Sequence, residues 1–247
     1  MNGGDPAFAP LKLTPGYRRV AESIAARIRD RSLATGEPLP TEVELASQLG
    51  VTRSTLREAL RELESQGLLA RRRGTKRMVV SRPDTASVVA QVSHALAMHD
   101  VTVAEVCDAL LLLEPPLAEV AATAATVART RAIEAAAAAF RASPDTQGAL
   151  QAVTAFFEAV DAATGNRALQ MAQRPLLPLL QGSLRLVIDS VPQARARIAL
   201  AQRRLAAAIA ARDSHAAREW MAKHIRDLRR GFAVAGIALG TAVRPPD

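Results

Sequence analysis

The chain has 247 residues, a formal net charge of +8 and an isoelectric point of about 11.0. Hydrophobic residues make up 49% of it and aromatic residues only 3%, so that Ala, Leu and Val must fill the core or cores, which predicts a mainly α protein. The only cysteine is Cys107, which excludes an intrachain disulfide and a cysteine-based zinc site and fits a reducing compartment.

The charge is concentrated in the first third of the chain. Residues 1–82 contain 15 Lys and Arg against 9 Asp and Glu, whereas residues 83–247 contain 17 against 15. A polyanion partner is therefore expected for the first third. No charged-then-apolar leader opens the chain, and the apolar run at 232–243 is too short to cross a bilayer, so we expect a cytoplasmic protein with no membrane partner.

Three helices are predicted in the first third. Apolar residues at helical spacing from Val20 place the first helix before the Gly and Pro of residues 36–40. Thr41 and Glu44 form a capping-box pattern for a short second helix, which Gly50 ends. Thr52 caps a third helix with a leucine stripe. The tight link between the second and third helices predicts a helix-turn-helix.

A basic hairpin is predicted next. The short apolar runs LLA and MVVS flank RRRGTKR, a basic tip that contains one glycine. This pattern predicts a wing after the helix-turn-helix. We therefore assign residues 1–82 to a winged helix-turn-helix domain and residues 83–87 to a polar, proline-containing linker.

The remainder of the chain is rich in Ala and Leu and predicts an all-α bundle over residues 88–238, followed by a tail at 239–247. The predicted helices cover residues 88–99, 102–124, 129–142, 147–164, 167–189, 194–212 and 214–238. Two proline pairs should kink or split two of these helices, Pro115 and Pro116 the second and Pro175 and Pro178 the fifth.

An arginine row on the third helix is the first sign of function. Arg53, Arg57 and Arg61 are spaced by four residues, so they share one exposed strip that could enter a DNA major groove. Thr52 and Thr55 add hydroxyl groups at the helix N-terminus, where phosphate is favoured. Ion pairing of these arginines with neighbouring glutamates on a solvated surface is the alternative.

The wing tip favours the DNA interpretation. Like charges crowd the hairpin, and they repel unless a phosphate backbone neutralises them. The tip residues expected to contact DNA include Arg72, Arg73 and Lys76. No nucleophile with a spaced His and acid, no glycine-rich phosphate loop and no paired-carboxylate motif is found, so no enzyme is predicted.

The segment EPLPTEVELASQLGVTRSTLREALRELESQGLL resembles the winged-helix signature of the GntR transcription regulators. The resemblance implies DNA contacts from the start of the recognition helix and from the wing tip. Those positions are Thr52, Arg53, Thr55, Arg57 and Gly74. Many members carry Arg after the Pro-x-Glu of the second helix, where this chain has Val43, so one expected contact is missing.

The C-terminal part is similar to the helical effector domain of the FadR-type branch, known as FCD. The landmarks are DALLLLEPPLAEVAA, FFEAVDAATGNRAL and AAIAARDSHAAREWMAKH. In metal-binding members, an Asp and three His hold a divalent ion and an Arg binds the effector's carboxylate. Carried over by position, the ligands fall on Val153, Phe157, Gln202 and His224 and the arginine on Leu110.

Only His224 keeps its ligand type, which is too few donors for a divalent ion. The sequence therefore predicts no metal or other cofactor and an apolar effector, unless a filled core leaves the domain only to dimerise. The expected function is that of a ligand-responsive repressor which binds an inverted-repeat DNA operator as a homodimer. A metal-dependent enzyme and a sequence-blind architectural DNA binder are the alternatives from other classes: the first lacks its ligands, and the second leaves the large helical domain unexplained.

Overall fold

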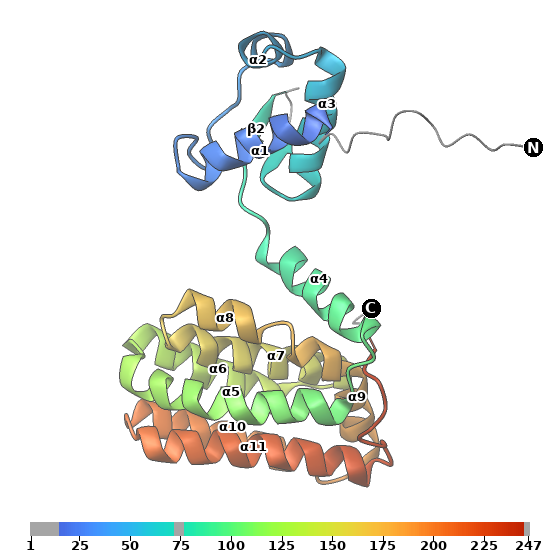
Figure 1. Ribbon diagram of the computed structural model, residues 1–247. Coiled ribbons are helices and arrows are strands. Elements are labelled where there is room, and N and C mark those ends of the chain that lie inside the picture. Colours follow the sequence, from blue (N-terminus) through green and yellow to red (C-terminus); the bar gives the residue numbers. More distant parts are fainter. Residues whose placement is uncertain (1–14, 72–76, 245–247) are drawn as a thin grey trace, which may run out of the picture. The chain divides into compact units, whose positions relative to one another are not determined.

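The computed structural model describes residues 15–71 and 77–244, and the chain divides into two compact units, residues 1–84 and 85–247 (Figure 1). Each unit has its own hydrophobic core. The fold class predicted from the sequence, a winged helix-turn-helix followed by an all-α bundle, is confirmed.

The N-terminal unit contains three helices and a two-stranded sheet. Their bounds are α1 Gly16–Arg29, α2 Glu42–Leu49, α3 Arg53–Ser65, β1 Leu69–Arg71 and β2 Met78–Val80. The apolar face of α3, formed by Leu56, Ala59, Leu60 and Leu63, is buried against α1 and α2. The amphipathic pattern of the sequence thus becomes the core of this unit.

Local capping fixes the turn between α2 and α3. Thr41 accepts a hydrogen bond from the Glu44 N–H at 3.3 Å, and the Glu44 carboxylate accepts one from the Thr41 N–H at 2.9 Å. Gly50 ends α2 with a left-handed φ of 65°. Because Thr52 caps α3 two residues later, the link between the helices is as short as the sequence predicted.

The wing is built on an antiparallel pair, with Leu69 opposite Val80. A third segment joins this sheet, because Leu39 N–H donates to the Met78 carbonyl and Val80 N–H to the Glu37 carbonyl, both at 2.9 Å. The sequence analysis did not anticipate this third segment. Its backbone hydrogen bonds tie the link between α1 and α2 to the base of the wing.

In the C-terminal unit, five helices pack in a ring, in the order α5, α11, α10, α6, α7 and back to α5, and α10 also contacts α5 across it. The bounds in this unit are α4 Thr85–Met98, α5 Val103–Ala124, α6 Val127–Ala142, α7 Thr146–Ala163, α8 Arg167–Gln173, the 3-10 helix η1 Leu177–Leu180, α9 Gln181–Ser190, α10 Ala194–Ala210 and α11 Ser214–Val234. The small alanine side chains allow these helices to pack around one apolar centre.

The two proline pairs have different effects. Pro175 and Pro178 split the predicted helix 167–189 into α8, η1 and α9. Helix α5 is not split at Pro115 and Pro116, although a split was one of the two expected outcomes. A proline inside a helix removes its own N–H donor and crowds the carbonyl of the preceding turn, but the packing of α5 against α11 and α7 offsets this cost.

Two boundaries differ from those assigned on the sequence. Helix α4 begins at Thr85, so residues 85–87 are helical and do not belong to a linker. The segment assigned as a tail packs back on the start of α5, where Val103 N–H donates to the Thr241 carbonyl at 3.0 Å and the Val243 side chain is buried. Burial of this valine explains why the segment stays with the bundle. Within the described residues, no helix has the length and apolar character needed to span a membrane.

Gly50 and Gly67 both have left-handed φ angles, of 65° and 71°, but their surroundings differ. A Cβ at Gly50 would meet no atom within 4 Å, whereas one at Gly67 would lie 3.1 Å from the Pro83 Cα. We predict that Gly50→Ala lowers the stability of the N-terminal unit by about 1 kcal/mol, from backbone strain alone, and that Gly67→Ala lowers it further. Urea unfolding of the two variants checks the order, and equal losses would contradict it.

Candidate DNA-binding surface and effector site

The start of α3 gathers four of the predicted DNA-binding residues at the turn after α2. Thr52 Oγ1 accepts a hydrogen bond from the Thr55 N–H at 3.2 Å and lies 2.9 Å from the Thr55 hydroxyl. Arg53 and Arg57 project from the same end of the helix and are exposed. The free N–H groups of a helix N-terminus, two hydroxyls and two guanidinium groups are thus presented together, a combination suited to phosphate and base-edge contacts.

Arg57 has a partner in the protein. Its Nε donates to Glu42 Oε2 at 2.7 Å, which joins α3 to the first residue of α2. The Arg57 side chain nevertheless keeps 59% of its surface exposed. Because one ion pair uses only part of the guanidinium fork, the remaining donors stay available to a ligand.

Arg53 and Arg61 form no ion pair with any residue that the structure describes. Arg61 is exposed but lies eight residues after Arg53, about 12 Å along the helix axis. It lines a shallow surface hollow with Tyr17, Glu58 and Glu62. The structure therefore does not bring Arg61 together with the residues at the start of α3.

Val43, in the position where the resemblance leads one to expect arginine, is 52% exposed on the first turn of α2. An apolar side chain there supplies no charge to DNA. Four predicted wing residues, Arg72, Arg73, Gly74 and Lys76, lie outside the described residues. Next to them, Arg71 Nε lies 3.4 Å from Glu64 Oε1.

The five predicted effector residues are all buried inside the helical ring. Leu110 comes from α5, Val153 and Phe157 from α7, Gln202 from α10 and His224 from α11. The Phe157 and His224 rings are stacked, with centroids 5.5 Å apart and an angle of 19° between their planes. The structure therefore brings together two positions that correspond to metal ligands in the resembling proteins, and an aromatic ring fills one of them.

Gln202 and His224 lie within about one helical turn of each other. The contacts Arg197–Asp227 and Arg204–Trp220 fix the antiparallel register of α10 and α11 and place Gln202 beside the turn that ends at His224. Among the residues that the structure describes, neither amide atom of Gln202 has a hydrogen-bond partner, nor has His224 Nε2. Burial lowers the pKa of His224 to about 4, against a smaller opposing effect of Asp227, so the imidazole is neutral at pH 7.

A buried acidic pair, missed in the sequence analysis, lies between α5 and α7. Glu114 and Asp161 are both almost fully buried, and the Gln173 amide donates to Glu114. Burial and the neighbouring Asp161 hold the pKa of Glu114 well above its usual range, and burial raises the pKa of Asp161 to about 7 against the opposing effect of Arg174. One signal was present: Asp161 follows Phe157 by four residues, on the same helical face.

Cys107 and three further histidines are not among the predicted site residues. Cys107 is buried, and burial raises the pKa of its thiol to about 11, so it is a core residue. His94, His99 and His215 are exposed. Within residues 15–71 and 77–244, no three side chains of the His, Cys, Asp or Glu type meet in a group that could hold a metal ion.

Comparison with known proteins identifies both units. Residues 16–79 match the family model described as bacterial regulatory proteins, gntR family, and residues 105–227 match the FCD domain. The chain is 32% identical over 220 residues to the putative L-lactate dehydrogenase operon regulatory protein of Escherichia coli K12, with 84% of each chain covered. The chain belongs to the GntR family.

Other members agree with this assignment. The Glc operon transcriptional activator of Escherichia coli K12 is 29% identical over 222 residues, covering 86% of this chain and 87% of the activator. A solved structure, Streptococcus agalactiae GntR, superposes with a TM-score of 0.58 at 25% identity and covers 87% of this chain and 99% of its own. This GntR-family protein is thus a transcription regulator with a DNA-binding unit and an FCD effector domain.

The arrangement around Phe157 leads to a prediction about metal. We expect this protein to bind no divalent ion tightly, because Val153 and Phe157 offer no donor. The triple variant Val153→Asp, Phe157→His, Gln202→His should acquire a zinc site together with His224. Elemental analysis after dialysis against zinc measures both proteins. Near one zinc per chain in the unmodified protein would contradict the prediction.

Proposed function

We propose that this GntR-family protein is a ligand-responsive repressor that binds an inverted-repeat operator as a homodimer. The observation that carries the proposal is the capped N-terminus of α3, where the exposed Thr52, Arg53 and Arg57 and the half-buried Thr55 lie within the first two turns. One recognition helix reads only a few base pairs, and a two-fold dimer doubles these contacts. The wing residues Arg72, Arg73, Gly74 and Lys76 would add backbone contacts.

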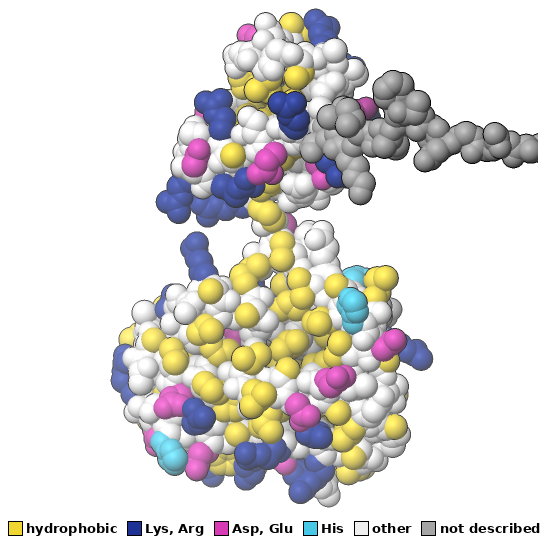
Figure 2. All heavy atoms as spheres, viewed as in Figure 1, with side chains coloured by type: hydrophobic (Ala, Val, Ile, Leu, Met, Phe, Trp, Pro, Cys, Tyr) yellow, Lys and Arg dark blue, Asp and Glu magenta, His cyan; other side chains and the backbone are white. Residues whose placement is uncertain are grey.

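A symmetric partner is favoured by an apolar face on the C-terminal unit. Figure 2 shows hydrophobic side chains gathered over the face that α4, α5 and α8 form. On α5, Leu112 is 76% exposed, and Leu113 and Val120 are also exposed. Contiguous apolar surface of this kind is typical of an interface, whereas isolated exposed leucines are common on any surface.

The composition of helix α4 also favours a symmetric partner on this face. Of its 14 residues only Ser93 is buried, yet the helix contains no Asp, Glu, Lys or Arg. A helix that faced only water would normally carry charged residues on its outer side. We therefore assign this face to a second copy of the chain, in an isologous contact.

The effector would bind within the FCD domain, at the cluster that contains Gln202 and His224. Val153, Phe157 and Leu110 make its surroundings apolar and offer neither an anion-binding arginine nor a metal ligand. The stacked Phe157 supports the alternative of a filled core that only dimerises. The unpartnered atoms of Gln202 and His224 favour a ligand site, because buried donors and acceptors without partners are costly.

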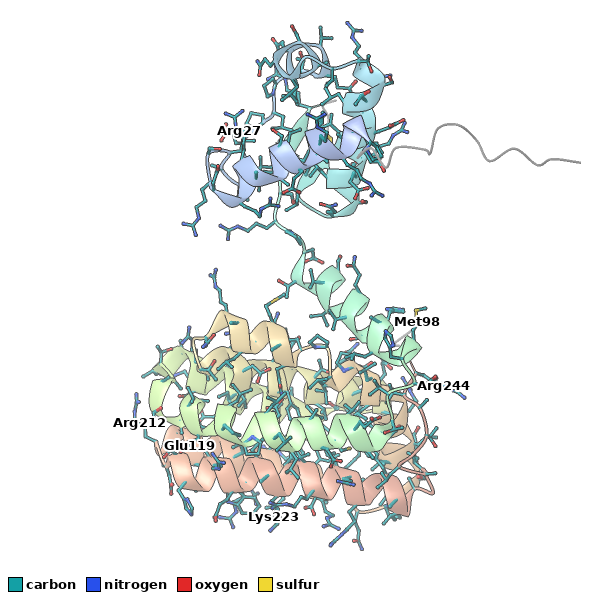
Figure 3. The ribbon with its side chains drawn as sticks, in the orientation of Figure 1. Arg27, Met98, Glu119, Arg212, Lys223 and Arg244 are labelled. Carbon is teal, nitrogen blue, oxygen red and sulfur yellow. The ribbon has the colours of Figure 1, made fainter. Side chains whose placement is uncertain are left out.

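We predict that Arg53→Ala and Arg57→Ala each weaken operator binding by about 1–3 kcal/mol, the usual cost of losing a base-edge contact. Operator DNA is first selected from a random pool by the purified protein, and affinities for operator and random DNA are then compared at two salt concentrations. Arg27→Ala is the matched control, because Arg27 is an exposed arginine in the last turn of α1 and is not a predicted DNA-binding residue (Figure 3). Equal losses in all three variants would contradict an interface centred on α3.

The apolar face gives a separate prediction. Leu112→Glu should shift the protein from dimer to monomer in sedimentation experiments, because it places a charge in the proposed interface. Leu200→Glu makes the same change at an exposed leucine on α10, outside that face, and should leave the dimer intact. A monomeric unmodified protein on saturated operator DNA would refute the proposed dimer.

A further inference from the structure

A cavity of about 130 Å³ between α9, α10 and α11 ends on His224. Most of its wall is apolar, formed by Val187, Val191, Ala194, Ile198, Leu228 and Val234. In another protein, an apolar cavity of about 150 Å³ takes up benzene. The space beside His224 therefore fits a body of about that size.

The inner end of the cavity is polar. Among the described residues, His224 Nε2 has no hydrogen-bond partner. The amide atoms of Gln202 have none either; this residue does not line the cavity but lies one turn after the lining residue Ile198 on α10. Both side chains are more than nine-tenths buried. One unpartnered atom, His224 Nε2, is thus held out of water on a residue of the cavity wall, where a bound molecule could satisfy it, and the two amide atoms of Gln202 lie one helical turn beyond the wall residue Ile198.

This inner end carries no net charge at neutral pH. The imidazole of His224 is neutral because burial lowers its pKa to about 4. Arg197 and Asp227 also line the cavity, and their charges neutralise each other at 2.8 Å. Arg230, which also lines the cavity, is exposed to solvent, so a carboxylate directed inward would lose its hydration without gaining a buried cation.

We propose that this cavity binds a small neutral molecule with an apolar body the size of one aromatic ring and a hydrogen-bonding head group, an alcohol or a primary amide, directed at His224 and Gln202. The proposal rests on the effector role given above to the FCD domain and names the class of its ligand. A primary amide offers both a donor and an acceptor, which match the amide of Gln202. Small carboxylates should not bind at the inner end, because they would lose their hydration there without gaining a buried cation.

Four probes of equal ring size test the class: benzamide, benzyl alcohol, toluene and benzoate. Binding is measured from the rise in melting temperature with concentration and from the fluorescence of Trp220. Trp220 is the only tryptophan of the chain and lies one turn before His224, with Lys223 Nζ 4.6 Å from its ring centroid. Figure 3 shows Lys223 on the outer side of α11.

Benzamide and benzyl alcohol should bind more tightly than toluene, on the order of fivefold for one net hydrogen bond, and benzoate should bind most weakly. His224→Phe and Gln202→Leu should abolish the preference for benzamide over toluene. Gln202→Leu should also raise the melting temperature of the free protein, since it removes two unpartnered buried atoms. Such a rise in the melting temperature of Gln202→Leu would show that its loss of preference for benzamide does not come from unfolding.

Ala194→Leu should block all four probes by filling the cavity, whereas Ala196→Leu, an exposed position two residues later on α10, should not. The proposal would be overturned if benzoate bound most tightly, or if the Gln202 and His224 variants bound benzamide as tightly as the unmodified protein does. The absence of a response to any probe would also overturn it. Operator binding and dimerisation are measured without probes, so their failure would refute the proposed function separately.

Discussion

Polar side chains in the core of the C-terminal unit are almost fully buried, and this burial determines their protonation. Alanine-rich helices pack closely enough that Gln202 and His224 are almost entirely buried. The imidazole therefore stays neutral. A neutral imidazole beside a stacked phenyl ring cannot hold a carboxylate as a cation would, and one donor cannot hold a metal ion. In the proposed effector site, burial thus disfavours charge recognition in addition to the replaced ligand positions.

The N-terminal unit is subject to the opposite constraint. Its functional groups are charged and remain in water, so they gain little from one another: the Arg57–Glu42 ion pair is short but exposed. The interactions of such charged groups become strong only when a bound partner excludes the solvent around them. The two units therefore hold the polar groups of their candidate sites in opposite surroundings, charged and exposed on α3 and buried in the core of the C-terminal unit.

Much of the fold could be predicted because its signals are local. Thr41, Glu44, Gly50 and Thr52 define helix ends through contacts within a few residues, and leucine spacing defines the buried face of α3. The features that were missed depend on long-range contacts. The pairing of the segment before α2 with β2, and the meeting of Glu114 with Asp161, join residues more than 35 positions apart.

The two candidate sites show the same contrast between local signals, which could be predicted, and long-range contacts, which could not. Its residues could be named one at a time by resemblance, and the burial of an apolar Val153 or Phe157 follows from helical periodicity. The stacking of Phe157 on His224 could not be predicted, because it depends on how α7 and α11 face each other. Likewise, the four-residue spacing of the arginines fixed their common strip on α3 but not the engagement of Arg57 by Glu42 from another helix.

The buried ionisable groups also determine how folding exchanges protons with the solvent. Asp161 keeps its proton up to about pH 7 in the folded chain but loses it near pH 4 when unfolded, so this group favours folding at low pH. His224 acts in the opposite direction, because the unfolded chain protonates it below about pH 6.5 and the folded chain only near pH 4. The two effects offset each other between these limits. Glu114, whose pKa is also raised, acts in the same direction as Asp161, so this acidic pair takes up protons on folding and its contribution to stability declines as the solution becomes less acidic.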